Sequence, residues 1–141
     1  MTTIIVKSFE FEASHQLPYH DGKCRNLHGH SYKLDVILQG EPVTDVGSPQ
    51  EGMVVDFGEV SAVVKPRIIE KLDHRFIAKG DEQIFIPEEQ IITIGVRSTA
   101  ENIGKWILNE LRETALAEKL VGVRVWETAS GRAEVYVERE R

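Results

Sequence analysis

The chain has 141 residues, one cysteine and a net charge of −6, which corresponds to a single domain, residues 1–141, that can bury a core without a disulfide or a structural metal. The lone cysteine excludes an intrachain disulfide and fits a reducing compartment, while the acidic balance disfavours nonspecific binding to nucleic acid or anionic membranes. Because no apolar run approaches the roughly 18 residues of a membrane span and no signal-like segment opens the chain, we expect a cytoplasmic protein.

Two long strands are predicted in the first forty positions. Between Ile5 and His15 the odd positions are mainly apolar and the even positions mainly polar, which is the period of a half-buried strand. After the turn-rich stretch HDGKC the alternation resumes at His28 and runs to Leu38. His15 therefore ends the apolar face of the first strand, and His28 and His30 begin that of the second.

Two helices are predicted next. Asp56 followed by Glu59 is the pattern of a capping box, and Pro66 inside the following helix predicts a kink or a later helix start. Ser98 with Glu101 marks the start of a second, amphipathic helix. The apolar positions of the two helices are Val60, Val63, Val64, Ile68 and Leu72, and then Ile103, Trp106, Ile107 and Leu111.

The remaining segments complete the predicted topology. Residues 80–95, GDEQIFIPEEQIITIG, suggest an irregular excursion that could hold a short hairpin. Two closing strands are predicted at residues 120–128 and 132–139. The order β-β-α-α-β-β predicts an α+β domain, an antiparallel four-stranded sheet with two helices on one face. The helix-free face would be exposed in a monomer, so we expect an oligomer.

Three histidines form the main functional pattern. His28 and His30, two apart on a strand, present their imidazoles to the same face, and His15 can supply a third nitrogen from the neighbouring strand. Three histidines with one open position are typical of catalytic rather than structural zinc. Nitrogen ligands favour Zn²⁺ over magnesium or calcium, although iron, nickel or cobalt would also fit. The alternative interpretation is a polar loop that is rich in histidine.

Other candidate residues are spread along the chain, and only Cys24 is expected in a loop beside the histidines. Cys24 is either a thiol activated by a nearby cation or an ordinary buried cysteine. Asp73 beside His74 could be an acid/base pair or a surface pair. Glu127 continues an apolar strand face, so its carboxylate either serves a ligand or emerges into solvent. Ser98, Thr99 and Asp56 are explained at least as well by helix capping as by ligand binding.

Six motifs together resemble one family. They occur in the family's order over nearly the whole chain: FEFEASHQLP, CRNLHGHSY, GMVVDFGEV, LDHRF, STAENI and WET. The sequence is similar to the 6-pyruvoyl-tetrahydropterin synthase and 6-carboxy-tetrahydropterin synthase family. This resemblance implies the tunnelling fold (T-fold), a trimeric β-barrel, two trimers stacked as a homohexamer, and active sites between subunits.

The resemblance also implies roles for individual residues. His15, His28 and His30 match the zinc ligands; Cys24, Asp73 and His74 match the catalytic group; Glu127, Thr99 and Ser98 match the pterin-binding positions, although Ala100 stands where some members carry a hydroxyl. The spacing of CRNLHGH is similar to that of the bacterial carboxy-forming enzymes of the 7-deazaguanine (queuosine) pathway.

The implied reaction converts 7,8-dihydroneopterin triphosphate and water to 6-carboxy-5,6,7,8-tetrahydropterin, acetaldehyde and triphosphate, a carbon–carbon lyase reaction. Lys23, Arg25 and Arg132 are candidates for holding the triphosphate. A pyruvoyl-forming enzyme and a noncatalytic zinc-binding interaction module on the same fold are the alternatives.

Overall fold

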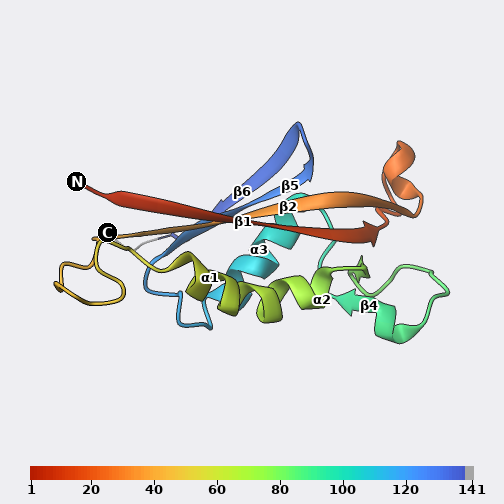
Figure 1. Ribbon diagram of the computed structural model, residues 1–141. Coiled ribbons are helices and arrows are strands. Elements are labelled where there is room, and N and C mark those ends of the chain that lie inside the picture. Colours follow the sequence, from red (N-terminus) through yellow and green to blue (C-terminus); the bar gives the residue numbers. More distant parts are fainter. Residues whose placement is uncertain (139–141) are drawn as a thin grey trace.

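The computed structural model describes residues 1–138 as one sheet with helices against it (Figure 1). The strands are β1 Thr3–His15, β2 His28–Gly40, β3 Arg75–Ala78, β4 Ile91–Thr93, β5 Leu120–Thr128 and β6 Gly131–Tyr136. The helical segments are α1 Phe57–Val64, the π-helical η2 Lys65–Ile69, α2 Glu70–Leu72, α3 Ala100–Leu111, and the 3₁₀ turns η1 Lys23–Arg25 and η3 Glu88–Gln90. The last predicted strand extended to Arg139, which lies outside the described residues.

The prediction of an antiparallel four-stranded sheet is wrong in strand number and in orientation. The sheet has six strands in the order β4-β3-β1-β2-β5-β6. The four long strands pair with one another in antiparallel fashion, as predicted, but β3 runs parallel to β1 and β4 runs parallel to β3. The sheet is therefore mixed.

The two additional strands are too short to give a sequence signal. β3 pairs with β1 only at Ala13 and Ser14, and β4 has three residues, so neither strand shows a full period of alternation. Their partners are distant in sequence, and only the folded chain brings them together. Since β4 pairs with β3 in parallel, the excursion of residues 80–95 contains no hairpin of the kind suggested.

The first helix begins where its capping signal predicted. The Asp56 carboxylate accepts a hydrogen bond from the Gly58 N–H at 2.7 Å, and the helix starts at Phe57. Pro66 does not delay the start but lies in the wider turns of η2. Proline lacks an N–H and crowds the carbonyl four residues earlier, and a π-helical stretch accommodates both effects.

The N-cap of the second helix lies one residue later than predicted. Thr99, not Ser98, is the N-cap of α3, and its hydroxyl accepts a hydrogen bond from the Asn102 N–H at 3.2 Å. Ser98 is fully buried instead. The two residues offer the same hydroxyl chemistry, so only the backbone path determines which of them caps the helix.

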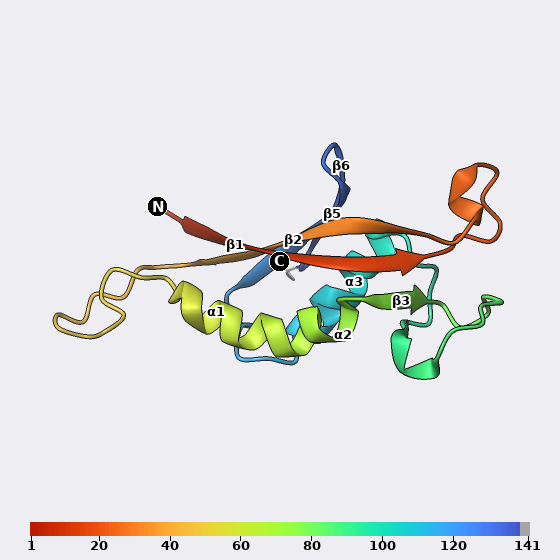
Figure 2. The same ribbon diagram turned by 45° about the vertical axis from the view of Figure 1, so that its right-hand side comes forward.

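The helices cover one face of the sheet (Figure 2). The core lies between them and the inward side chains of β1, β2 and β5, and it includes Phe11, Tyr32, Leu34, Val123, Ile68, Ile103, Ile107 and Leu111. The loop between β1 and β2 and the excursion after β3 lie at the same end of the molecule (Figure 2). None of the helices within residues 1–138 has the length and hydrophobicity of a membrane-spanning segment.

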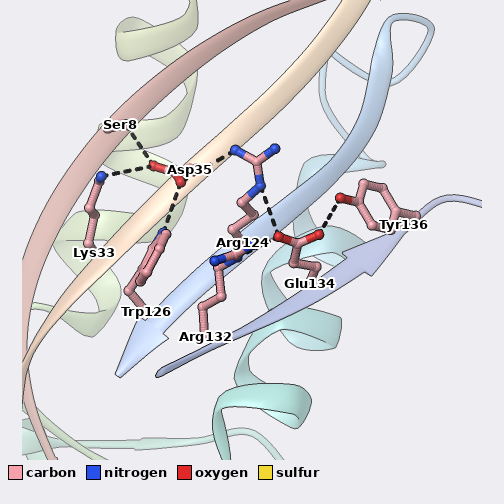
Figure 3. Close-up of polar contacts among 8 residues, drawn as sticks. All are labelled: Ser8, Lys33, Asp35, Arg124, Trp126, Arg132, Glu134 and Tyr136. Atoms are coloured by element: carbon pink, nitrogen blue, oxygen red, sulfur yellow. Dashed lines mark hydrogen bonds and ion pairs between the residues drawn. The ribbon is translucent and has the colours of Figure 1, made fainter. Parts of the chain in front are cut away.

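The helix-free face carries a polar network (Figure 3). Asp35 is 4% exposed and accepts hydrogen bonds from the Ser8 hydroxyl at 2.6 Å and the Trp126 indole N–H at 2.9 Å. Arg124 joins Asp35 to Glu134, with nitrogen–oxygen distances of 3.8 and 3.2 Å. This face therefore carries a network of paired charges, and the exposed apolar side chains of Ile4 and Val6 lie on the same face of β1.

Candidate functional site

The hairpin of β1 and β2 brings the three predicted metal-binding histidines together. In its register His15 stands directly opposite His28, and Ala13 stands opposite His30. Side chains two apart on a strand share a face, so all three imidazoles lie on the core side at the end of the hairpin. The Nε2 atom of His15 lies 2.9 Å from that of His28 and 3.2 Å from that of His30. The predicted convergence is confirmed.

Backbone carbonyls fix the orientation of two of these rings. His15 Nδ1 lies 2.6 Å from the Ser98 carbonyl oxygen, and His28 Nδ1 lies 2.7 Å from the Asn26 carbonyl oxygen. A carbonyl can only accept, so each Nδ1 carries the proton and donates it. In the neutral rings both Nε2 atoms are therefore lone-pair acceptors, and they face each other across 2.9 Å.

A carboxylate completes the cluster. Glu127 Oε1 lies 3.0 Å from His30 Nε2 and 3.3 Å from His15 Nε2. Glu127 continues the core-facing side of β5 two residues after Val125, and the pairing of β5 with β6 shifts register at this point, between Trp126 and Thr128. A protonated His15 donates a hydrogen bond from Nε2 to Glu127, and this bond together with the positive charges of protonated histidines lowers the pKa of Glu127, although burial opposes them.

The donor set fits a divalent metal ion. His15, His28, His30 and Glu127 each offer one ligand atom, and these atoms all lie within 4.8 Å of one another. Zinc–nitrogen bonds of about 2.0–2.1 Å in a tetrahedral shell place two nitrogens about 3.3 Å apart, close to the spacing of the Nε2 atoms. Facing lone pairs and a carboxylate repel one another unless a proton or a metal ion lies between them.

The surroundings of the cluster are buried. His15 is fully buried, and burial is also the main reason why the pKa of His30 is lowered. A lowered pKa keeps the imidazole neutral, the form that binds metal. Two nearby side chains, Tyr32 and Ser98, are buried with hydroxyls that have no hydrogen-bond partner among the described residues. Burial raises the pKa of Tyr32 far above its usual value, so this phenol stays protonated.

Cys24 lies on the loop that joins the two ligand-bearing strands. It is half-buried in η1, and its carbonyl accepts a hydrogen bond from the Leu17 N–H at 2.8 Å, which closes the loop. The backbone of Cys24 is therefore fixed at the same end of the hairpin as His15 and His28.

Asp73 and His74 form the predicted pair but lie outside the metal cluster. Asp73 Oδ1 lies 3.0 Å from His74 Nδ1 and accepts a hydrogen bond from the Glu12 N–H, which is the main reason why the pKa of Asp73 is lowered. His74 adopts a left-handed φ of 59°, and its side chain is 75% exposed. No polar contact within residues 1–138 joins this pair to the histidine cluster.

A cleft of about 390 Å³ nevertheless has one residue of each group in its wall. His30 and His74 both line it, and Ile86 and Gln90 of the excursion form another part of its wall. The structure therefore brings the three histidines and Glu127 into contact, and it places His74 on a shared cleft.

Sequence patterns missed the roles of three residues. The Ser98 carbonyl and the Glu12 N–H act through the backbone, which no side-chain motif reveals. Arg97 pairs with Asp81 across sixteen positions, and this pairing has no local periodicity.

Comparisons with known proteins identify the family and the fold of this chain. The family described as 6-pyruvoyl tetrahydropterin synthase matches residues 4–138. The chain is 37% identical to 6-carboxy-5,6,7,8-tetrahydropterin synthase of Haemophilus influenzae, covering 92% of this chain and 96% of that protein. It is 36% identical to the protein of the same name from Synechocystis, covering 96% and 95%.

Solved structures show the same fold. An uncharacterized protein from Wolinella succinogenes aligns with a TM-score of 0.79 and 26% identity, over 98% of this chain and 99% of that one. The 6-pyruvoyltetrahydropterin synthase of Plasmodium vivax, at 23% identity, aligns with a TM-score of 0.78 over 99% of both chains. Fold and site thus define a T-fold protein with a histidine cluster suited to a metal. The chain belongs to the 6-pyruvoyl tetrahydropterin synthase family.

Proposed function

We propose that the protein is a zinc-dependent 6-carboxy-5,6,7,8-tetrahydropterin synthase of 7-deazaguanine (queuosine) biosynthesis. The observation that carries the proposal is the convergence of three Nε2 atoms, two of them on rings whose Nδ1–H groups are held by carbonyls. The names of the relatives from Haemophilus influenzae and Synechocystis support the carboxy-forming reaction.

His15, His28 and His30 would hold the metal. Neutral imidazoles whose other nitrogen donates to the backbone are strong and correctly oriented ligands for Zn²⁺. When bound, zinc supplies a Lewis acid that makes protons on the coordinated substrate hydroxyls and the adjacent carbon easier to remove.

Cys24 and the Asp73–His74 pair would move protons along the substrate side chain while triphosphate leaves and acetaldehyde is released. The Asp73 carboxylate orients the His74 imidazole through Nδ1, which leaves Nε2 as the proton-exchanging atom in the cleft shared with His30. His74 is largely exposed, as expected for a residue whose catalytic surroundings are completed by another subunit.

Glu127 would bind the pterin ring. An ionised carboxylate accepts the N–H groups of the ring, and the lowered pKa of Glu127 keeps it ionised. Ser98 and Thr99 are the further pterin-binding candidates. Ser98 is the stronger of the two, because its buried hydroxyl has no hydrogen-bond partner among the described residues, while the Thr99 hydroxyl caps α3.

The assembly would be a homohexamer of two stacked trimers with active sites between subunits. Within the described chain, β3 pairs with the outer edge of β1 only at Ala13 and Ser14, and the backbone of Glu12 is bonded to Asp73 and His74. The edge along residues 3–11 can therefore pair with another strand. β6 offers the second free edge. Joining these edges around a three-fold axis would close a barrel and place the polar network of Figure 3 on its inner side.

Product analysis with 7,8-dihydroneopterin triphosphate tests the function. Metal-replete protein should release acetaldehyde and triphosphate and form 6-carboxy-5,6,7,8-tetrahydropterin. A product with a diketo side chain would instead identify a pyruvoyl-forming enzyme. Absence of turnover by the zinc-loaded protein would favour a noncatalytic zinc-binding interaction module on the same fold.

A further inference from the structure

The excursion of residues 80–95 forms part of the cleft wall, and a bidentate ion pair also ties it to the segment that leads into α3. Arg97 Nη1 and Nη2 each lie 2.9 Å from one oxygen of Asp81. This bidentate arrangement fixes both the distance and the angle between the guanidinium and the carboxylate, whereas a single hydrogen bond between flexible side chains does not fix the angle. The hydrogen bonds with Arg97 lower the pKa of Asp81 and raise that of Arg97.

The same guanidinium contacts the loop that carries Cys24. The Arg97 Cζ atom lies 5.5 Å from the centre of the Tyr19 ring, within the range of a cation–π contact. Tyr19 is 84% exposed, so packing in the core does not hold it in place. Arg97 thus connects the excursion and the β1–β2 loop, two segments at the same end of the molecule (Figure 2).

The backbone of Arg97 leads directly to a ligand-orienting group. Its carbonyl accepts hydrogen bonds from the Thr99 N–H at 2.9 Å and the Asn102 side-chain amide at 3.0 Å. The next residue, Ser98, provides the carbonyl that accepts the hydrogen bond from the His15 Nδ1–H group. Displacement of this peptide by a few tenths of an ångström would lengthen the 2.6 Å contact that sets the His15 ring.

We propose that Arg97, held by Asp81 and Tyr19, is a positioning residue that fixes the Ser98 carbonyl and through it the orientation of the His15 imidazole. We name this three-residue arrangement the Arg97 clamp. The inference rests on the metal site of the proposed function, and it assigns a role to the excursion: the excursion supplies Asp81.

The contribution of the clamp is local. Side-chain exposure of 21% for Arg97 and 44% for Asp81 means that solvent screens the pair, so it adds little to global stability. Direct hydrogen-bond partners of metal ligands typically change metal affinity by about 10–100-fold. Arg97→Lys keeps the positive charge but loses the guanidinium that makes two parallel hydrogen bonds to Asp81. Because the clamp acts one residue further from the ligand, we expect this variant to weaken zinc binding about threefold to tenfold.

Zinc affinity, measured by competition with a chromophoric chelator, tests the clamp without pterin turnover. Asp81→Asn serves as a second variant, because it is nearly isosteric but removes the charge and replaces one of the two acceptor oxygens by an NH₂ group that cannot accept from Arg97. Arg67→Lys is the matched control: Arg67 pairs with Glu110 at 2.8 Å near the far end of α3, and this substitution should leave affinity within about twofold. Unchanged affinity in both clamp variants, or an equal loss in the control, would overturn the proposal.

Amide hydrogen exchange of the metal-free protein gives a separate readout. In Arg97→Lys the Thr99 amide should exchange faster, while amides of β2 should keep the parent rate. An unaltered rate at Thr99 would contradict the clamp even if zinc does not bind. Conversely, equal zinc binding by His15→Ala and the parent would overturn the metal site, whatever the clamp variants show.

Discussion

Zinc should stabilise the metal-free protein strongly, because the three Nε2 atoms converge only in the folded chain. A ligand that binds only the folded state adds about 4.1 kcal/mol when its free concentration is about 1,000 times the dissociation constant. An unfolding entropy of about 2.1 cal/mol/K per residue gives about 0.3 kcal/mol/K for 141 residues. The melting temperature should therefore rise by about 14 °C.

Removal of one imidazole should abolish this rise. His28→Ala deletes one ligand, and because His28 is only half-buried, the metal-free stability should change by no more than about 1 kcal/mol. Circular dichroism melts of chelator-treated protein, with and without zinc at one fixed protein concentration, measure both effects. His20→Ala is the control, since His20 is exposed in the same loop and its Nδ1 accepts the Gly22 N–H. A full zinc-dependent rise in His28→Ala would refute the ligand assignment.

Three further predictions concern the thiol, the sheet and the acid/base pair. Cys24→Ala should retain zinc but lose turnover by about 100-fold or more, and undiminished product formation would remove the thiol from the mechanism. Gly122→Ala should lower the free energy of unfolding by about 2–3 kcal/mol in urea titrations, because its Cβ would lie 2.5 Å from the Val135 carbonyl oxygen; an unchanged midpoint would contradict this clash. The pKa of Asp73 is depressed below 3.8, so its carboxylate stabilises the fold above that pH and the contribution disappears as pH falls further. Asp73→Asn should therefore show a shallower loss of stability below about pH 4, an effect kept small by the 38% exposure of the side chain, and identical acid titrations would contradict it.

Local patterns in the sequence were sufficient for the elements that carry the site. Alternation located β1 and β2 to within two residues, and the H-x-H pair with His15 at the end of the preceding strand predicted one shared face. The capping residue Asp56 located the start of α1. These features follow from interactions between near neighbours in the chain, such as strand alternation and capping hydrogen bonds, and such interactions have a fixed sequence period or spacing.

Contacts between distant segments were decided only by the tertiary structure. β3 and β4 are held by parallel pairing to strands far away in sequence, and the carbonyl that orients His15 comes from Ser98, 83 positions later. Glu127 meets the imidazoles because β5 pairs with β2, and Thr99 rather than Ser98 caps α3 because of the local backbone path. A hydrogen bond to a backbone group depends on position and not on side-chain type, so the sequence alone determined which donors could form the site, and the fold determined how they are oriented.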